Sequence, residues 1–199
     1  MTTAKRNTIV LVMLISAFVA MLNQTILNTA LPAIIKGLNI TETTAQWLIT
    51  GFMLVNGIMI PLTAFLMDKY TTRKLYIFSM AAFLIGSIIA ALSPGFEILM
   101  VARIIQAIGA GILLPLMQFT VFTLFPVEKR GFAMGLTGIV AQTAPAIGPT
   151  LTGLLIDFFS WRMPFYIVAA IALIAFAIGF FFVENNGQTK ETVLDKISV

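Results

Sequence analysis

The segment Leu99–Phe119, LMVARIIQAIGAGILLPLMQF, contains one permanent charge, Arg103, in an otherwise apolar stretch. It overlaps a longer run, residues 104–127, that contains no Asp, Glu, Lys or Arg. About 20 apolar residues are enough for a helix to cross the hydrocarbon of a bilayer. A guanidinium cannot escape such surroundings by becoming neutral. The stretch therefore predicts a transmembrane helix that carries a cation.

Five further charge-free runs of similar length predict the other membrane spans. They cover residues 7–35, 43–67, 75–96, 131–156 and 163–183. Of the 199 residues, 59% are hydrophobic and only 10% are charged, with a mean hydropathy of +1.02, whereas soluble domains carry about 25% charged residues. The sequence thus predicts an all-α membrane protein with six transmembrane helices, at roughly residues 8–31, 45–67, 75–93, 98–120, 131–155 and 164–183.

These spans define the expected organisation of the chain. Residues 1–183 form a six-helix transmembrane bundle, and residues 184–199 form a polar cytoplasmic tail or a linker between two bundles. When the N-terminus is placed in the cytoplasm, only Lys36 and Arg162 lie in outside loops. Nine of the 12 basic residues then lie inside: Lys5, Arg6, Lys69, Arg73, Lys74, Lys129, Arg130, Lys190 and Lys196. This asymmetry predicts a multi-pass protein of the cell membrane with both termini in the cytoplasm.

The residue types that are missing exclude several kinds of chemistry. The chain contains no Cys and no His, which excludes disulfides, thiol nucleophiles and ordinary zinc sites. No paired carboxylates lie within the predicted spans, so acid–base and nucleophilic catalysis lack their groups. We therefore expect no enzyme activity, cofactor or metal. The net charge of +4 is a consequence of topology and does not indicate a nucleic-acid partner.

Two turns of the chain resemble each other. AFLMDKYTTRKLYIF follows the second predicted helix, and GLLIDFFSWRMPFYI follows the fifth. In each, an Asp is followed five residues later by an Arg: Asp68 with Arg73, and Asp157 with Arg162. The two copies are about three spans apart, so they lie on opposite faces of the membrane. This pattern predicts that helices 1–3 and 4–6 are two inverted three-helix repeats, an arrangement found in transporters.

The first predicted helix contains a cluster of polar residues within LNQTILNTALPAI. Asn23, Gln24, Thr25, Asn28 and Thr29 cannot share one narrow stripe, so some must face the protein interior. Thr25 or Thr29 can satisfy its hydroxyl on its own backbone. The cluster is interpreted either as interhelical hydrogen bonding, worth about 0.6 kcal/mol per bond, or as part of a cavity wall.

Arg103 allows two interpretations. Its position six residues after Glu97 would let it reach the outer headgroups. Alternatively it lines a cavity or belongs to a buried polar network, because Gln106 lies one turn further along and small residues continue that face. On this second interpretation, the amide oxygens of the first helix are its expected partners.

The fifth predicted helix is rich in glycine and proline. Its segment 135–153, GLTGIVAQTAPAIGPTLTG, includes Gly135, Pro145, Gly148, Pro149 and Gly153. Small residues let helices approach closely, and proline kinks them. The composition favours a bent, tightly packed element near a gate, although ordinary small-residue packing would also account for the glycines.

Taken together, four ordered segments between residues 21 and 166 resemble the major facilitator superfamily, and within it the drug:proton antiporters of the fourteen-span type. They are LNQTILNTALP, WLITGFMLVNGIMIPLTAFLMDKYTTRK, RIIQAIGAGILLP and GLTGIVAQTAPAIGPTLTGLLIDFFSWRMPF. The chain departs from the family pattern where Asn23 replaces an Asp. Glycines expected by the pattern are replaced by Ala64, Thr71, Ala107, Ala144 and Thr152.

The resemblance implies a fold and a set of roles. The fold is one bundle of a major facilitator transporter, and the activity is secondary export of drug-like amphipathic compounds by alternating access with proton antiport. A substrate cavity or proton relay would contain Asn23, Gln24, Asn28, Arg103 and Gln106. A cytoplasmic gate clamp would contain Asp68, Lys69, Arg73 and Lys74. The hinge would contain Gly135, Pro145, Gly148, Pro149 and Gly153.

The expected partners are a small-molecule substrate, protons, the lipid bilayer and a second six-helix bundle. A lone bundle would expose Asn23, Asn28, Arg103 and Gln106 on its cavity-facing side, where unsatisfied polar groups in hydrocarbon are costly. The second bundle would be a covalent continuation or another chain. Two alternatives remain open: a truncated or half-size membrane subunit that does not transport, and a transporter for uptake of a polar solute.

Overall fold

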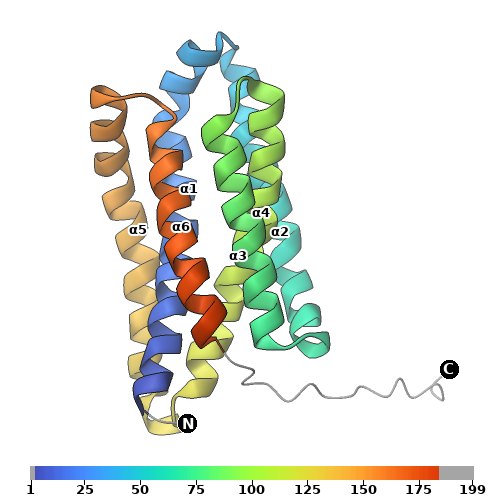
Figure 1. The fold of residues 1–199 in the computed structure, drawn as a ribbon, viewed down its shortest axis with the longest axis vertical. Coiled ribbons are helices and arrows are strands. Elements are labelled where there is room, and N and C mark those ends of the chain that lie inside the picture. Colours follow the sequence, from blue (N-terminus) through green and yellow to red (C-terminus); the bar gives the residue numbers. More distant parts are fainter. Residues whose placement is uncertain (1–2, 184–199) are drawn as a thin grey trace, which may run out of the picture.

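The computed structural model describes residues 3–183 and contains the six predicted helices (Figure 1). Short connections join them, and the helices run alternately up and down the bundle. The helices are α1 (Thr3–Leu38), α2 (Glu42–Lys69), α3 (Thr72–Leu92), α4 (Phe96–Leu124), α5 (Arg130–Phe158) and α6 (Met163–Phe182), with a 3-10 turn η1 (Val127–Lys129) before α5. The all-α membrane class is confirmed. The tail or linker predicted at 184–199 lies outside the described residues.

The helices are longer than the charge-free runs suggested. α1 covers residues 3–38 where 8–31 were expected, and α2 continues through Asp68 to Lys69. A helix of 36 residues is about 54 Å long at 1.5 Å per residue, well beyond the hydrocarbon thickness of about 30 Å. The sequence criterion locates the part inside hydrocarbon, whereas the helix continues into the headgroup region, where charged side chains are hydrated.

Threonine side chains begin two of the helices. Thr41 accepts a hydrogen bond from the backbone N–H of Thr44 at 3.2 Å, and Thr71 accepts one from that of Lys74 at 3.4 Å. Such N-caps satisfy backbone donors that have no partner in the first turn of a helix. Thr71 occupies one of the positions where the family pattern has glycine, and here it caps α3.

Helix packing follows the predicted inverted repeat. The α1–α5 contact has its counterpart in the α4–α2 contact. The α1–α6 contact likewise has its counterpart in the α4–α3 contact. α1 and α4 also contact each other, as do α3 and α6. Exchanging helices 1–3 with helices 4–6 therefore reproduces the same set of neighbours, so the fold consists of two inverted three-helix repeats.

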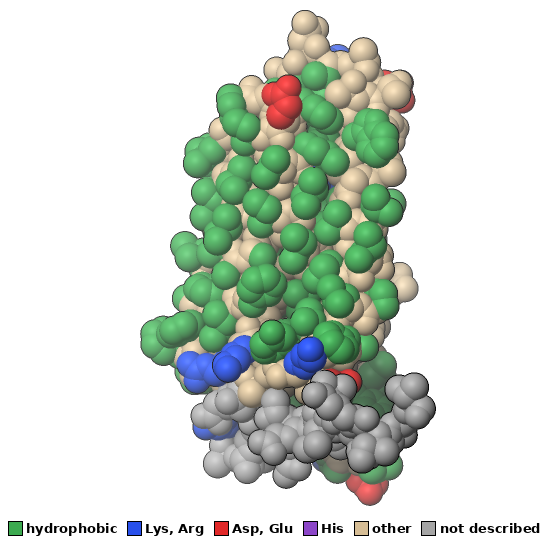
Figure 2. Space-filling view, turned by 90° about the vertical axis from the view of Figure 1, so that its right-hand side faces the viewer, with side chains coloured by type: hydrophobic (Ala, Val, Ile, Leu, Met, Phe, Trp, Pro, Cys, Tyr) green, Lys and Arg blue, Asp and Glu red, His purple; other side chains and the backbone are tan. Residues whose placement is uncertain are grey.

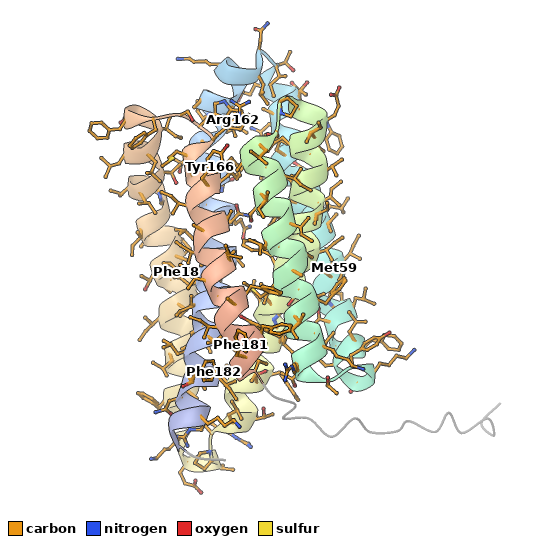
Figure 3. The ribbon with its side chains drawn as sticks, viewed as in Figure 1. Phe18, Met59, Arg162, Tyr166, Phe181 and Phe182 are labelled. Carbon is orange, nitrogen blue, oxygen red and sulfur yellow. The ribbon has the colours of Figure 1, made fainter. Side chains whose placement is uncertain are left out.

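The two arginines of the repeated turns make equivalent contacts. Arg73, at the start of α3, donates from Nη2 to the carbonyl oxygen of Phe180 near the end of α6, at 3.0 Å. Arg162, just before α6, donates from Nη2 and Nε to the carbonyl oxygen of Ser93 after α3, at 2.8 and 3.3 Å. Arg162 lies at the end of the bundle opposite Phe181 and Phe182 (Figure 3). Each arginine thus joins α3 to α6 at one end of the bundle.

The aspartates of these turns do not pair with the arginines. Asp68 and Asp157 are exposed, and neither forms an ion pair within residues 3–183. The last carbonyls of a helix lack intrahelical partners and carry partial negative charge, so they attract the guanidinium groups. The carboxylates stay hydrated instead.

The surface is apolar between two charged ends. On the side that carries α2, hydrophobic side chains cover the middle of the molecule, and charged side chains lie near its two ends (Figure 2). α1, α3 and α4 are the most buried spans, whereas α2 and α5 are the least. The core therefore lies between α1, α3 and α4, and α2 and α5 present broad outer faces.

Candidate functional site

Arg103 lies in the interior of the bundle. It is 1% exposed, and its Nη1 donates to Oε1 of Gln106 at 2.9 Å. Gln106 donates from Nε2 to Oγ of Ser87 on α3 at 3.0 Å, and Ser87 donates to the carbonyl oxygen of Phe83 at 2.7 Å. The interpretation that Arg103 reaches the outer headgroups is therefore wrong, because its own helix and α3 provide a polar path inside the bundle.

An aromatic ring from α2 completes the surroundings of this cation. The guanidinium carbon of Arg103 lies 4.1 Å from the centroid of the Phe52 ring, and Phe52 is itself buried. A desolvated cation on an aromatic face gains about 2 kcal/mol, which offsets part of the free-energy penalty for a charge in the membrane. Within the described chain, Arg103 forms no ion pair, and its Nε has no hydrogen-bond partner.

Glycines on α3 and α4 permit these two helices to approach each other closely. A Cβ on Gly86 would lie 2.7 Å from Cγ of Gln106 and 2.8 Å from its backbone nitrogen. A Cβ on Gly109 would lie 2.7 Å from the backbone nitrogen of Phe83. These distances are too short for any side chain unless the helices separate. Gly86 therefore allows Gln106 to lie against α3, within reach of Ser87.

The polar residues of helix 1 separate into three environments. Asn23 is fully buried, Gln24 is partly buried and Asn28 is exposed. The expected backbone bonds are confirmed, since Thr25 donates to the carbonyl oxygen of Leu22 at 2.8 Å and Thr29 to that of Thr25 at 3.3 Å. The four residues Asn23, Asn28, Arg103 and Gln106 do not share an exposed face.

Two expectations about helix 1 are thus corrected. Its amides do not hydrogen-bond to Arg103: both amide atoms of Asn23 are buried without a partner in the described part of the chain. A lone bundle also does not expose Asn23, Arg103 and Gln106 to lipid. The reason is that a buried charge is less costly beside hydrogen-bond partners and an aromatic ring than beside hydrocarbon, so the bundle folds around these groups.

The residues expected in a gate clamp lie at one end of the bundle. Lys69 and Lys74 are exposed, and the ammonium of Lys69 lies 4.5 Å from the centroid of the Phe65 ring. Arg73 contacts the end of α6, as described above, and Asp68 is exposed on the last turn of α2. The structure brings the four side chains to one surface but does not join Asp68 to any of the three cations.

The glycines and prolines of α5 lie on two different faces. Gly148 is buried against Thr25 of α1, on the same stripe as Ala144 and Thr152. The remaining hinge candidates lie away from α1: Gly135, Pro145 and Pro149 are exposed, and Gly153 is partly exposed. An open depression on this outer face is lined by Gly135, Gly138, Ile139, Gln142, Thr143 and Ala146. α5 therefore uses small residues on its inner face to approach α1 and leaves others unpacked.

Comparison with known proteins identifies the family. A model of the Major Facilitator Superfamily matches residues 13–197, which is most of the chain. The chain belongs to the major facilitator superfamily. The resemblance read from the four ordered segments is confirmed, and the family consists of transporters rather than enzymes.

Curated members of the superfamily match most of the chain. It is 50% identical to the uncharacterized MFS-type transporter YcnB of Bacillus subtilis over 98% of its length, covering 41% of that protein. It is 41% identical to the lincomycin resistance protein LmrB of the same organism over 96% of its length, covering 40% of LmrB. The probable multidrug resistance protein EmrY of Escherichia coli is 34% identical over 82% of the chain, which covers 32% of EmrY. The chain thus spans about two fifths, or less, of these relatives.

A solved transporter structure shares the fold. A structure of the peptide transporter POT in complex with sulfate superposes with a TM-score of 0.70 at 14% identity, covering 83% of this chain and 36% of the other. At this identity the likeness concerns the fold alone. It supports the six-helix bundle as a unit of the superfamily architecture.

Sequence reasoning missed several buried groups of this superfamily member. Ser87 and Phe52 contact Gln106 and Arg103, but nothing distinguishes them in sequence from other residues of their spans. The hydroxyl of Tyr76 is also buried, where it donates to the carbonyl oxygen of Ala175 and hydrogen-bonds to Oγ of Ser16, both at 2.9 Å. This second polar contact joins α3 to α6 and α1 and lies outside the family motifs quoted above.

Proposed function

We propose that the chain is one bundle of a secondary exporter that moves drug-like amphipathic compounds across the membrane in exchange for protons. The observation that carries this proposal is the buried cation Arg103, hydrogen-bonded to Gln106 and covered by Phe52. A charge retained at membrane depth points to a functional role. The names of LmrB and EmrY, which refer to drug resistance, support export of drug-like compounds.

We propose that Arg103 and Gln106 act in the substrate cavity or proton relay, together with Asn23, Gln24 and Asn28. Of these residues, Asn28 is exposed and Gln24 is partly exposed, so these two are the ones able to meet a compound directly. Arg103, Gln106 and the fully buried Asn23 lie deeper in the bundle and would act without direct contact with the compound. The hydrogen bonds of Arg103 and Gln106 would change partners as the transporter alternates between its two states.

The proton itself requires a titratable group elsewhere. Every carboxylate in residues 3–183 is exposed and lies near a helix end: Glu42, Asp68, Glu97, Glu128 and Asp157. Asn23 is neutral where the family pattern has an acid. We therefore assign the proton-carrying group to a second bundle, which is either a covalent continuation of this chain or another chain.

The exposed faces of α2 and α5 are the proposed contacts with that bundle. These two helices are the least buried, and α5 exposes small residues that permit close helix packing. Asp68, Lys69, Arg73 and Lys74 would form the gate clamp across the two bundles at the cytoplasmic end. The exposed positions Gly135, Pro145 and Pro149, with Gly148 and Gly153, would form the hinge. The lysine and arginine asymmetry supports a cell-membrane protein with both termini in the cytoplasm.

A resistance and flux assay tests the function. Bacterial cells without their own drug exporters would express the chain together with a second six-helix bundle, and growth in lincomycin and accumulation of a fluorescent amphipathic dye would be measured. Export predicts higher resistance and lower dye accumulation, both lost in Arg103→Gln and retained in Gln118→Leu, an exposed position on the same helix. Uptake of a polar solute would support the alternative transporter class. Stable membrane expression with no flux of any compound would favour a non-transporting subunit.

A further inference from the structure

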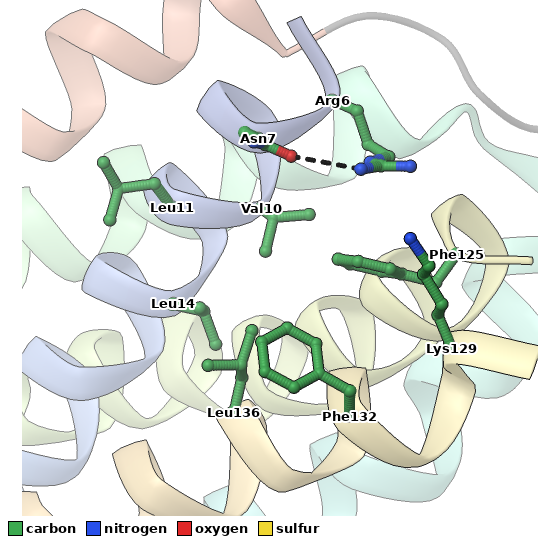
Figure 4. Close-up of a pocket in the computed structure, with 9 residues that line it drawn as sticks. All are labelled: Arg6, Asn7, Val10, Leu11, Leu14, Phe125, Lys129, Phe132 and Leu136. Carbon is green, nitrogen blue, oxygen red and sulfur yellow. Dashed lines mark hydrogen bonds between the residues drawn. The ribbon is translucent and has the colours of Figure 1, made fainter. Parts of the chain in front are cut away.

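A pocket lies where the first turns of α1 meet the connection between α4 and α5 (Figure 4). Its volume is about 630 Å³. Two cations, Arg6 and Lys129, line its charged side, and apolar side chains including Leu14, Phe132 and Leu136 line the rest. It belongs to neither the Arg103 network nor the residues proposed for the clamp.

The charged side of this pocket is arranged to receive an anion. The guanidinium carbon of Arg6 lies 4.8 Å from the centroid of the Phe125 ring, and its Nη2 donates to Oδ1 of Asn7 at 3.4 Å. Its buried Nε has no partner within the described residues. Lys129 is exposed and also lines the pocket, and no Asp or Glu does so. Two positive charges therefore converge on one opening without an acidic neighbour in the lining.

The apolar side continues from these charges toward the middle of the membrane. Along α1, Arg6 and Asn7 are followed by Val10, Leu11 and Leu14, and Leu11 is 57% exposed. Phe132 and Leu136 lie opposite on the first two turns of α5. From its charged end inward, the pocket lining thus presents a cation, then an aromatic ring, then an aliphatic groove over about two helical turns. A phospholipid presents its headgroup phosphate, glycerol region and acyl chain in the corresponding order.

The position of the pocket selects the leaflet. Arg6 and Lys129 lie at the same end of the bundle as Lys69, Arg73 and Lys74, the end that carries most of the basic residues. Basic side chains at the cytoplasmic surface are attracted to the anionic lipids of that leaflet. A phospholipid there would enter the groove from the side, with its headgroup already at the depth of the two cations.

We propose that this pocket is a binding site for an anionic phospholipid, whose phosphate lies between Arg6 and Lys129 and whose acyl chain lies along Leu14 and Leu136. The site distinguishes lipids by the net charge of the headgroup. Phosphatidylcholine is net neutral because a choline cation accompanies its phosphate, and that cation would lie at the opening that Arg6 and Lys129 line. Because the pocket lies outside the proposed transport site, the proposal holds whatever compound the transporter moves.

The test is lipid selectivity of the purified chain. The chain would be placed in nanodiscs containing equal amounts of phosphatidylglycerol and phosphatidylcholine, and the lipids that it retains would be counted by native mass spectrometry after release from the disc. Each cation near a membrane surface contributes about fivefold to the binding of anionic lipid. The double variant R6Q/K129Q is therefore expected to lose most of the preference for phosphatidylglycerol, by about tenfold or more.

Two controls separate the site from general effects. K69Q/K74Q removes the same charge at the same end but outside the pocket, and it should retain the preference. Leu136→Trp keeps both cations and fills the groove, so it should reduce retained lipid while leaving the melting temperature near that of the unmodified chain. K129Q alone changes an exposed residue and provides the folded single variant.

The outcomes decide the proposal. Loss of selectivity in R6Q/K129Q and K129Q, together with reduced retention in Leu136→Trp, supports it. Equal loss in K69Q/K74Q overturns it, because the preference would then follow total surface charge. Displacement of retained lipid by millimolar glycerol phosphate, which has a phosphate but no acyl chain, also overturns it by showing a simple anion site.

Discussion

Arg103 and Gln106 form a hydrogen-bonded pair one helical turn apart, with 2.9 Å between Nη1 and Oε1, inside a bundle whose described carboxylates are all exposed near helix ends. The amide of Gln106 accepts from the cation and donates to Ser87 on α3. It therefore connects the charge to a second helix. This arrangement makes Gln106 the residue on which the polar interior most directly depends.

We expect Gln106→Leu to destabilise the bundle more than an equivalent change on the surface. Removing the amide leaves a buried charged donor without its acceptor, a loss of about 1–3 kcal/mol or more. The measurement is the melting temperature of the purified chain in detergent. Gln118→Leu is the matched control, because Gln118 is exposed on the same helix. Equal melting temperatures for the two variants would contradict the proposed importance of the Arg103–Gln106 pair.

We expect Gly86→Ala to destabilise the chain by about 1–3 kcal/mol, because overpacking forces backbone shifts. A methyl group there would lie 2.8 Å from the backbone nitrogen of Gln106 and the carbonyl oxygen of Ala102. Gly57→Ala on α2 is the control, since a Cβ there meets nothing within 4 Å and alanine raises helix propensity by about 1 kcal/mol. The melting temperature should therefore fall for Gly86→Ala and rise for Gly57→Ala. A neutral Gly86→Ala would show that α3 and α4 can separate at little cost.

We expect Arg162→Ala to destabilise the α3–α6 contact more than Arg73→Ala. Arg162 donates two hydrogen bonds to Ser93, whereas Arg73 donates one to Phe180. Hydrogen bonds from charged groups contribute about 1.5–3 kcal/mol, and exposed ones contribute less. Arg162→Lys should recover only part of the loss because an ammonium cannot reproduce the two-donor geometry. Limited proteolysis and melting temperature provide the ranking, which would be disproved by a larger effect at Arg73.

We expect Asn23→Asp to make stability depend on pH. Asn23 is fully buried and both its amide atoms lack partners in the described chain. A protonated aspartic acid resembles the amide it replaces, whereas the carboxylate is a buried charge. Stability of the variant should therefore be greatest in acid and fall as the pH rises, while the unmodified chain changes little. A variant that instead becomes more stable with rising pH would indicate that the new carboxylate pairs with a buried cation.

We expect the two ends of the bundle to lie on opposite sides of the membrane, with Glu128 inside. Because the chain has no Cys, single cysteines give no background. On intact cells, a membrane-impermeant maleimide should label Thr43→Cys. It should label Glu128→Cys only after the cells are lysed. Both positions are exposed in the structure. The reverse labelling pattern would invert the proposed topology.

The number and class of the helices follow from the sequence alone. Hydrocarbon thickness sets a minimum length for every uncharged run, so the spacing of charges in this chain determines six spans. The repeated Asp and Arg positions also indicate the inverted repeat. Because the two copies are an odd number of spans apart, the chain crosses the membrane in opposite directions at the two copies. Both properties depend on position along the chain, which the sequence records directly.

The direction in which each side chain points was decided by the tertiary structure. In a soluble helix an apolar stripe marks the buried face, but here lipid and protein interior are both apolar, so that contrast disappears. Asn23 and Asn28 therefore look equivalent in sequence, yet one is fully buried and the other is exposed. The helix ends were also underestimated, because the headgroup region accepts the charges that the sequence criterion treats as boundaries.

The partners of the buried cation depend on contacts between distant segments. Phe52 and Ser87 come to Arg103 and Gln106 from α2 and α3, and Gly86 permits the approach. The sequence determined that Arg103 would need such partners, because a guanidinium at membrane depth cannot lose its charge. Only the packing of three helices determined which residues they are, since many phenylalanines and serines in these spans could meet the same chemical need.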